Sequence, residues 1–290
     1  MSTHDGFTPL RSVLYMPSSN ARALEKARTI DCDALILDLE DAVAPDAKAD
    51  ARRAACAAAA SGEYGRRAVT IRVNALGTEW HDADLAAAAQ ACPAGIVVPK
   101  VSSVEDVHTL VAAMEAAGAP EHTKLWAMIE TPDGILDARA IARASERLTV
   151  LVLGTNDIVK ELYAEHVPGR WNILPSLHQV LLAARAAGVE VVDGVYNDVK
   201  DTEGFLAECE QGRRMGFDGK TLIHPGQVEG ANRAFSPDDD AVADAEGLIA
   251  AFDEAGSGVA TYRGRMVEQL HVDSARRTLA IAEAIRALGA

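Results

Sequence analysis

Residues 124–134 read KLWAMIETPDG, and this stretch joins a buried strand directly to a carboxylate. After Lys124 come five apolar residues, and then Glu130 follows without a break. Thr131 and Pro132 end the run in a way that is typical of the start of a helix. The stretch therefore predicts a strand, an acidic side chain at its carboxyl end, and a helix after it.

The same order of strand and helix recurs along the chain. Between the apolar runs lie Ala-rich amphipathic segments, several of which end in glycine, as helices often do. Parallel strands need such helical crossovers, and no G-x-G-x-x-G follows the first run, which disfavours a dinucleotide-binding sheet. We therefore predict an α/β fold, a (β/α)₈ TIM barrel. The eight expected strands are residues 12–16, 34–39, 68–74, 95–100, 124–130, 148–154, 189–194 and 220–225.

The barrel pattern stops near Phe235, where SPDDD interrupts the chain. We expect a catalytic barrel domain over residues 1–235. Residues 236–290 hold two further helical patterns separated by AGSGVATYRGRM. They predict a C-terminal helical extension that packs on the barrel or on a neighbouring subunit.

Composition excludes several classes of protein. The net charge is −15, and there is no basic cluster of the kind that nucleic acid requires, so no nucleic-acid partner is expected. No apolar run approaches the ~18 residues of a membrane span, and no signal pattern opens the chain. The four cysteines lie far apart without a C-x-x-C pair, which suits a reducing compartment. We expect a cytoplasmic protein.

Acidic residues gather at the expected carboxyl ends of the strands, where TIM barrels carry their chemistry. Glu130 and Asp157 follow neighbouring strands, which lie about 4.8 Å apart. No Cys or His accompanies them, so their oxygen atoms predict a Mg²⁺ site. The other reading is that Glu130 caps the helix that begins near Thr131.

Arg72 occupies an unusual place within TIRVN. Alternation puts Ile71 and Val73 on the helix-covered side of the strand and leaves Arg72 facing the barrel interior. A buried guanidinium needs an anion. Its partner is either an internal acid such as Asp38 or a carboxylate or developing enolate of a substrate.

Two lysines, Lys100 and Lys220, also lie at strand ends. Either could form a Schiff base with a carbonyl substrate, or a salt bridge with the acids around it.

Together these motifs resemble the citrate lyase beta subunit-like branch of the HpcH/HpaI aldolase superfamily. The stretches that carry the resemblance include ALILDLEDAVAPDAKADAR, TIRVNALGTEW, IVVPKVSS, MIETPDGIL, LVLGTNDIVKEL and GFDGKTLIHPGQV. The resemblance implies a TIM barrel, a homotrimer or hexamer, and reversible Mg²⁺-dependent cleavage of a 3-hydroxyacyl-CoA thioester. Such substrates are malyl-, citramalyl- or citryl-CoA, and cleavage gives an acyl-CoA and a 2-oxo acid.

Residue by residue, the resemblance implies that Glu130 and Asp157 bind the metal and that Arg72 and Glu130 contact the substrate. Glu40 and Asp41 would orient metal-bound water. Several lyases of the family also carry an Asp in a C-terminal G-x-M-[IV]-D pattern and use it as an acid across a subunit boundary. Here GRMVE puts Glu268 in that place. Glu268 is either that acid, with an altered substrate preference, or a surface residue.

We therefore predict a Mg²⁺-dependent carbon–carbon lyase. One alternative is a thioesterase, in which water attacks the same thioester. A second is a citrate lyase beta subunit that acts only with a carrier-protein partner. A third is a Schiff-base aldolase that uses Lys100 or Lys220.

Overall fold

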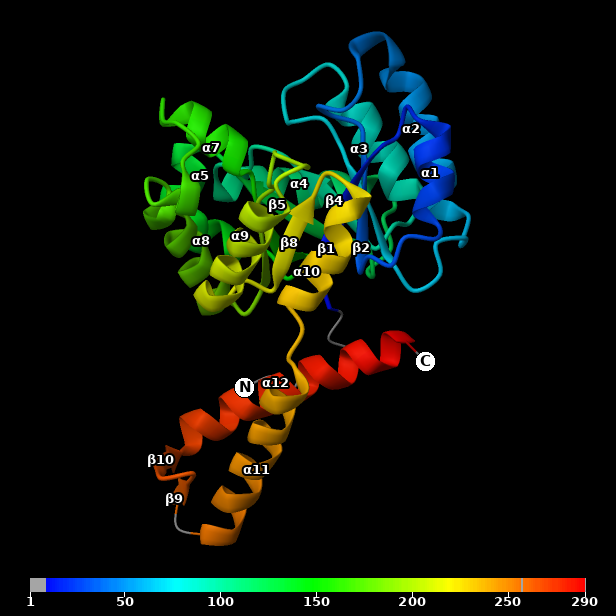
Figure 1. Cartoon of the computed structure of the whole chain (residues 1–290). Coiled ribbons are helices and arrows are strands. Elements are labelled where there is room, and N and C mark those ends of the chain that lie inside the picture. The colour runs from blue at the N-terminus through cyan, green and yellow to red at the C-terminus, as the bar shows by residue number, and fades with distance from the viewer. Residues whose placement is uncertain (1–8, 257, 290) are drawn as a thin grey trace. The chain divides into compact units, whose positions relative to one another are not determined.

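Eight parallel strands close into a barrel in the computed structural model, which describes residues 9–256 and 258–289 (Figure 1). Each strand pairs with its neighbours in the sequence, and β8 returns to pair with β1. The predicted barrel is therefore confirmed. The strands are β1 Ser12–Pro17, β2 Ala34–Asp38, β3 Ala68–Arg72, β4 Gly95–Val98, β5 Lys124–Ile129, β6 Leu148–Leu153, β7 Glu190–Asp193 and β8 Gly219–Leu222.

The pleat of the strands divides the barrel interior into an apolar core and a polar mouth. Val13, Ile36 and Met128 are buried in one apolar cluster inside the barrel. The residues two positions after these three are Tyr15, Asp38 and Glu130, and they line a cavity at the carboxyl end of the barrel. Because side chains two apart lie on the same face of a strand, one face supplies both core and site.

Helices on the outside of the barrel connect the strands (Figure 1). Their ends carry the expected chemistry: Ser103 and Asp106 form a capping box at the start of α4, and Gly188 closes α8 with a φ of 75°. The helices of the barrel unit are α1 Ala21–Ala27, α2 Lys48–Ala60, α3 His81–Gln90, α4 Val104–Ala116, α5 Pro132–Leu136, α6 Ala138–Ala142, α7 Thr155–Glu161, α8 Leu174–Ala187, α9 Thr202–Met215 and α10 Val228–Ala234, with 3₁₀ turns η1 Pro45–Ala47, η2 Pro168–Arg170 and η3 Pro225–Gln227.

The chain divides into two compact units: the barrel unit is Leu10–Ala234, and Pro9 belongs with the chain from Phe235 onward to the second unit. The second unit contains α11 (Asp239–Ala255), β9 (Val259–Tyr262), β10 (Arg265–Glu268) and α12 (Gln269–Gly289). The two strands pair antiparallel across a turn at Arg263 and Gly264, both with positive φ, as tight hairpins require. The sequence predicted two helices joined by a connecting stretch; that stretch forms this hairpin.

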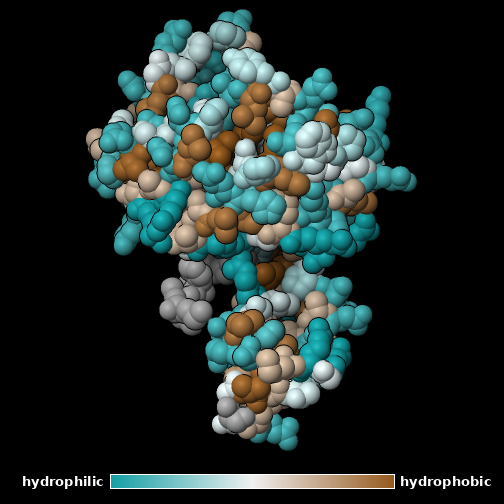
Figure 2. All heavy atoms as spheres, turned by 90° about the vertical axis from the view of Figure 1, so that its left-hand side faces the viewer, coloured by the Kyte–Doolittle hydropathy of each residue, from teal (hydrophilic) through white to brown (hydrophobic). Residues whose placement is uncertain are grey.

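The surface of the barrel unit mixes polar and apolar side chains. Figure 2 shows apolar residues scattered among hydrophilic ones over one face. Large exposed apolar side chains include Leu136, Tyr163, Trp171 and Leu182. Within the described part of the chain, no helix has the length and apolar character needed to cross a membrane.

Candidate functional site

A cavity of about 310 Å³ opens at the carboxyl end of the barrel. Its lining includes four residues that the sequence marked as functional: Asp41, Arg72, Glu130 and Asp157. Arg72 ends β3, and the three acids come from the segments after β2, β5 and β6, so the closure of the barrel brings together residues that are far apart in the sequence.

Glu130 is buried, with 1% of its surface exposed. The hydroxyl of Thr131, rather than Glu130, caps α5 by accepting a hydrogen bond from the Gly134 N–H. Glu130 instead accepts a hydrogen bond of 2.9 Å at Oε1 from the backbone N–H of Lys100. Burial, and then the neighbouring charge of Asp157, raise the pKa of Glu130 to about 8. A carboxylate in such a place is stabilised by a cation.

Asp157 lies in the first turn of α7, and its side chain is 26% exposed. Between the two acids the chain passes through Gly154, which precedes α7. A Cβ atom at Gly154 would lie 1.9 Å from Oε2 of Glu130, so only glycine leaves room for this carboxylate. The sequence LVLGTND thus supplies both Asp157 and the glycine whose missing side chain leaves room for Glu130.

Lys100 lies between the acids. Its Nζ atom is 3.1 Å from Oε1 of Glu40, 3.8 Å from Oε1 of Glu130 and 3.9 Å from Oδ1 of Asp157. Although burial opposes its charge, the carboxylates of Glu40 and Glu130 raise the pKa of Lys100. A Schiff base needs a neutral amine, so this environment disfavours the aldolase alternative for Lys100.

Arg72 faces the barrel interior, as its alternation in the sequence predicts. Its Nε and Nη2 atoms donate to the two carboxylate oxygens of Asp38, at 2.7 Å each. Its Nη1 lies 2.8 Å from Oε2 of Glu40 and 3.5 Å from Oδ2 of Asp41. Burial opposes the charge, but Asp38, Tyr15 and Glu40 together outweigh it and hold the pKa of Arg72 above its ordinary value. Asp38 therefore orients the guanidinium, and one edge of it borders the mouth cavity.

Glu40 links Arg72 to Lys100, with one oxygen near each. Its Oε2 atom is buried and has no hydrogen bond of good geometry. Burial raises the pKa of Glu40. Lys48 fixes the backbone of the segment that carries Glu40, because its Nζ donates to the carbonyl oxygens of Leu39 and Glu40 at 2.9 Å each.

Two residues at this site escaped the sequence analysis. One is Lys48, which occupies the first position of α2 in APDAK. The other is Tyr15, whose ring lies 4.8 Å from the guanidinium of Arg72. The alternation of SVLYMP would have placed Tyr15 inside the barrel, but the identity of its neighbour depends on how β1 aligns with β2 and β3.

Lys220 does not line the mouth cavity. It has no exposed surface, and its Nζ lies 3.1 Å from Oδ2 of Asp193 and 2.7 Å from Oε1 of Glu208. Arg170 binds Asp193 from the other side at 2.7 Å. Burial opposes the charge of Asp193, but the cations of Lys220 and Arg170 outweigh it and lower the pKa of Asp193. Lys220 therefore forms the salt bridge that the sequence allowed, and its enclosed, paired state disfavours the Schiff-base alternative.

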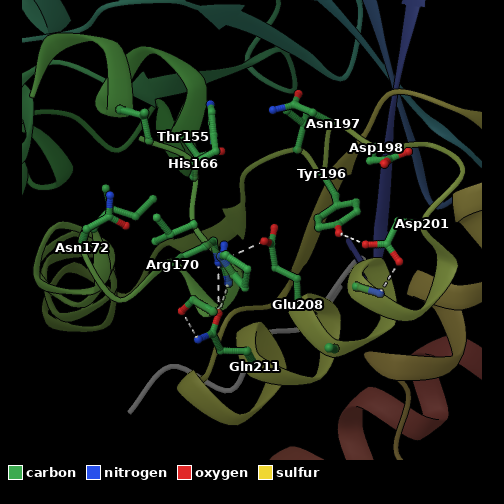
Figure 3. A pocket seen from close by; sticks show the side chains of 18 of the residues that line it. Thr155, His166, Arg170, Asn172, Tyr196, Asn197, Asp198, Asp201, Glu208 and Gln211 are labelled. Carbon is green, nitrogen blue, oxygen red and sulfur yellow. Dashed lines mark hydrogen bonds and ion pairs between the residues drawn. The ribbon is translucent and has the colours of Figure 1, made fainter. Parts of the chain in front are cut away.

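A second pocket has a volume of about 510 Å³, and Figure 3 shows the side chains that line it. Thr155 and Val195 line both cavities. Arg170, Glu208 and Gln211 interact at its base, and the hydroxyl of Tyr196 donates to Asp201 (Figure 3). Among the residues that line this pocket, Arg170 is already paired with Asp193 and Glu208. The other carboxylates of the lining therefore make the pocket acidic.

Glu268 belongs to the second compact unit, at the end of β10. Its side chain is half-buried, and its backbone N–H donates to Nδ1 of His271 at 3.1 Å. The role of Glu268 as an acid remains a prediction.

A metal ion at the mouth would be held by oxygen atoms. Over residues 9–256 and 258–289, no group of three or more His, Cys, Asp or Glu side chains is arranged to hold a metal ion. A closed structural metal site is thus absent from these residues. Mg²⁺, however, commonly binds through one or two carboxylates and leaves its other positions to water and substrate. The pair of Glu130 and Asp157 fits this requirement.

Comparison with known proteins supports the resemblance seen in the sequence. Residues 11–225 match the family model for HpcH/HpaI aldolase/citrate lyase. The chain is 52% identical over 285 residues to a (3S)-malyl-CoA thioesterase from Cereibacter sphaeroides (strain KD131 / KCTC 12085), covering 97% of this chain and 98% of that protein. It is 36% identical to the citrate lyase subunit beta of Escherichia coli (strain K12), covering 94% and 93%.

A solved structure shares the fold as well. It is that of protein CitE from Mycobacterium tuberculosis in complex with magnesium, acetoacetate and coenzyme A, with a TM-score of 0.78 and 28% identity. The match covers 95% of this chain and 98% of that one. By its sequence, its barrel and these relatives, the chain belongs to the HpcH/HpaI aldolase/citrate lyase family, in the citrate lyase beta subunit-like branch.

Proposed function

We propose that this protein is a Mg²⁺-dependent enzyme that acts on a 3-hydroxyacyl-CoA thioester of the malyl type, and that it hydrolyses the thioester. The observation that carries the proposal is the 52% identity, over 97% of the chain, to a protein named as a (3S)-malyl-CoA thioesterase. The mouth cavity supports it, since it combines two carboxylates suited to a hard cation with an arginine suited to a substrate carboxylate.

Glu130 and Asp157 are the residues that would hold the metal. Their oxygen atoms suit Mg²⁺, and the raised pKa of Glu130 reflects a buried carboxylate that a cation would stabilise. When bound, Mg²⁺ supplies Lewis-acid polarisation of the substrate oxygens.

Residues of this chain supply the remaining roles, which are substrate binding and activation of water. Arg72, which Asp38 orients through Nε and Nη2, lines the cavity, and its Nη1, now paired with Glu40, is the candidate donor to a substrate oxygen. Glu40 is the candidate general base for water, because its carboxylate lies between Arg72 and Lys100 at the mouth and burial raises its pKa. Asp41, which is exposed beside Arg72, lies where it would orient that water.

The second candidate is carbon–carbon cleavage of the same substrates, to an acyl-CoA and a 2-oxo acid. The relationship to citrate lyase beta subunits favours it. In that reaction Arg72 stabilises the enolate of the thioester, and Glu268 of a neighbouring subunit returns the proton to carbon. A variant of this reading, a subunit that acts only on a carrier-protein thioester, predicts no activity on free CoA thioesters.

One assay separates these candidates. The purified protein is mixed with malyl-, citramalyl- or citryl-CoA, with Mg²⁺ or with EDTA, and both free CoA thiol and 2-oxo acid are measured. Hydrolysis of malyl-CoA releases CoA and malate, whereas carbon–carbon cleavage gives acetyl-CoA and glyoxylate. Thiol release without glyoxylate is the expected result; no turnover of any of the three thioesters would refute the proposal.

We also propose that the protein assembles as a homotrimer or hexamer. Exposed apolar side chains on the barrel unit, Trp171 and Leu182 at 70% exposure each, support contacts with further copies. Light scattering coupled to size-exclusion chromatography gives the molar mass directly, and a monomer at micromolar concentration would contradict this assignment.

A further inference from the structure

Lys100 connects to the acids of the mouth through both its side chain and its backbone. Its backbone N–H donates to Oε1 of Glu130, and its Nζ lies within 4 Å of Glu40, Glu130 and Asp157. The side chain is 39% exposed, so packing does not fix the ammonium in place. Three carboxylates thus converge on one adjustable cation.

The backbone at Lys100 is strained to make this arrangement. Its φ is 56°, in the left-handed region that residues with a Cβ atom seldom adopt. The conformation directs the N–H at Glu130, while the hydroxyl of Ser102 donates to the Lys100 carbonyl at 2.9 Å. Strain of this kind persists where the surrounding contacts compensate for it, and it is common at functional sites.

The ammonium and a metal ion would compete for the same oxygen atoms. A Mg²⁺ ion held by Oε1 of Glu130 would lie about 2.1 Å from it. Nζ of Lys100 is 3.8 Å from that same oxygen. The two cations would then be less than about 6 Å apart, in a mouth that is only partly open to water, where like charges repel strongly.

We propose that Lys100 is an internal counter-ion of the metal site. Its ammonium holds Glu40, Glu130 and Asp157 together, and Mg²⁺ displaces it from Glu130 and Asp157 while its contact with Glu40 persists. Metal binding is then an exchange of one cation for another at a site that is already assembled. The inference rests on the proposed function, in which Glu130 and Asp157 are the metal ligands.

The test is calorimetric titration of the full-length protein with MgCl₂, comparing wild type with Lys100→Met. Methionine keeps an unbranched stem but removes the competing charge, so Mg²⁺ should bind about 5- to 150-fold more tightly, the usual range of coupling between two sites. In EDTA the variant should melt at a lower temperature than wild type, because Glu130 and Asp157 lose the ammonium beside them and Glu40 keeps only Arg72. Addition of Mg²⁺ should raise its melting temperature by more than it raises that of wild type.

Lys160→Met provides the matched control. Lys160 lies on α7 near the same mouth, is 72% exposed and pairs with Glu161, so its loss removes the same charge without removing a contact to the three acids. Its Mg²⁺ affinity should stay within about twofold of wild type, because exposed charges are well screened. Lys100→Gly is the second variant should Lys100→Met fail to fold, since glycine suits a φ of 56° and keeps the N–H that binds Glu130.

Two outcomes overturn the proposal in distinguishable ways. Mg²⁺ affinity that is unchanged or weaker in the Lys100 variants, while Glu130→Gln abolishes binding, shows a metal site from which Lys100 is not displaced. Wild-type protein that binds no Mg²⁺ at all removes the metal site of the proposed function, and the exchange with it.

Discussion

Gly154 offers a test of the metal site that leaves every carboxylate in place. A Cβ atom added there would lie 1.9 Å from Oε2 and 2.5 Å from Cβ of Glu130. The φ of Gly154 is −95°, outside the left-handed region that favours glycine, so the substitution acts mainly through the contact with Glu130.

The size of the effect follows from that overlap. To reach an ordinary contact distance, the carboxylate of Glu130 must move by about 1 Å or more. Binding sites tolerate errors of about 0.5 Å, and Mg²⁺ requires oxygen atoms at about 2.1 Å in a nearly octahedral arrangement. We expect Gly154→Ala to weaken Mg²⁺ binding about 100-fold, which corresponds to about 2.7 kcal/mol.

Gly95→Ala is the matched control for this experiment. Its added Cβ would lie 2.8 Å from Nε1 of Trp126, at the start of β4 and therefore at the opposite end of the barrel from the mouth. Overpacking costs about 1–3 kcal/mol of stability at either position. Both variants should therefore melt at a lower temperature, but only Gly154→Ala should lose Mg²⁺ in calorimetric titration. Wild-type affinity in Gly154→Ala would show that Glu130 does not bind the metal from this position.

Three further predictions concern proton binding, charge geometry and subunit exchange. Because the pKa of Glu130 is raised to about 8, its carboxyl must lose a proton to bind metal below that pH. The dissociation constant for Mg²⁺ should therefore rise about tenfold per pH unit as the pH falls from 8 to 6. An affinity independent of pH would contradict the assignment. Arg72→Lys should lower kcat/KM at least about 100-fold although charge is kept, because an ammonium cannot bind both oxygens of Asp38 while facing the cavity. Wild-type turnover with a lower melting temperature would instead assign Arg72 a purely structural role. If Glu268 acts across a subunit boundary in carbon–carbon cleavage, inactive Glu130→Ala and Glu268→Ala subunits should regain partial lyase activity when mixed into hybrid oligomers, whereas full lyase activity of Glu268→Ala alone would exclude that role.

The barrel and the approximate site of the acids followed from the sequence alone. Eight alternations of strand and helix predict the closed parallel sheet, because each parallel pairing needs a crossover. The carboxyl ends of such strands meet at one rim, so Glu130 and Asp157 were predicted to lie together although they are far apart in the chain. Alternation within TIRVN likewise placed Arg72 inside the barrel.

The partners of these residues were decided by the tertiary structure. A strand pattern gives the face on which a residue lies, but the alignment between strands decides which side chains meet, as it does for Tyr15 and Arg72. Lys100 and Lys220 both lie near strand ends in the sequence; the left-handed backbone at Lys100 turns its N–H to Glu130, whereas the pleat buries Lys220 outside the lumen against Asp193. Periodicity ends where the strand ends. Beyond that point, contacts between distant segments fix the direction of each side chain. These contacts place Lys100 at the mouth and bury Lys220 away from it.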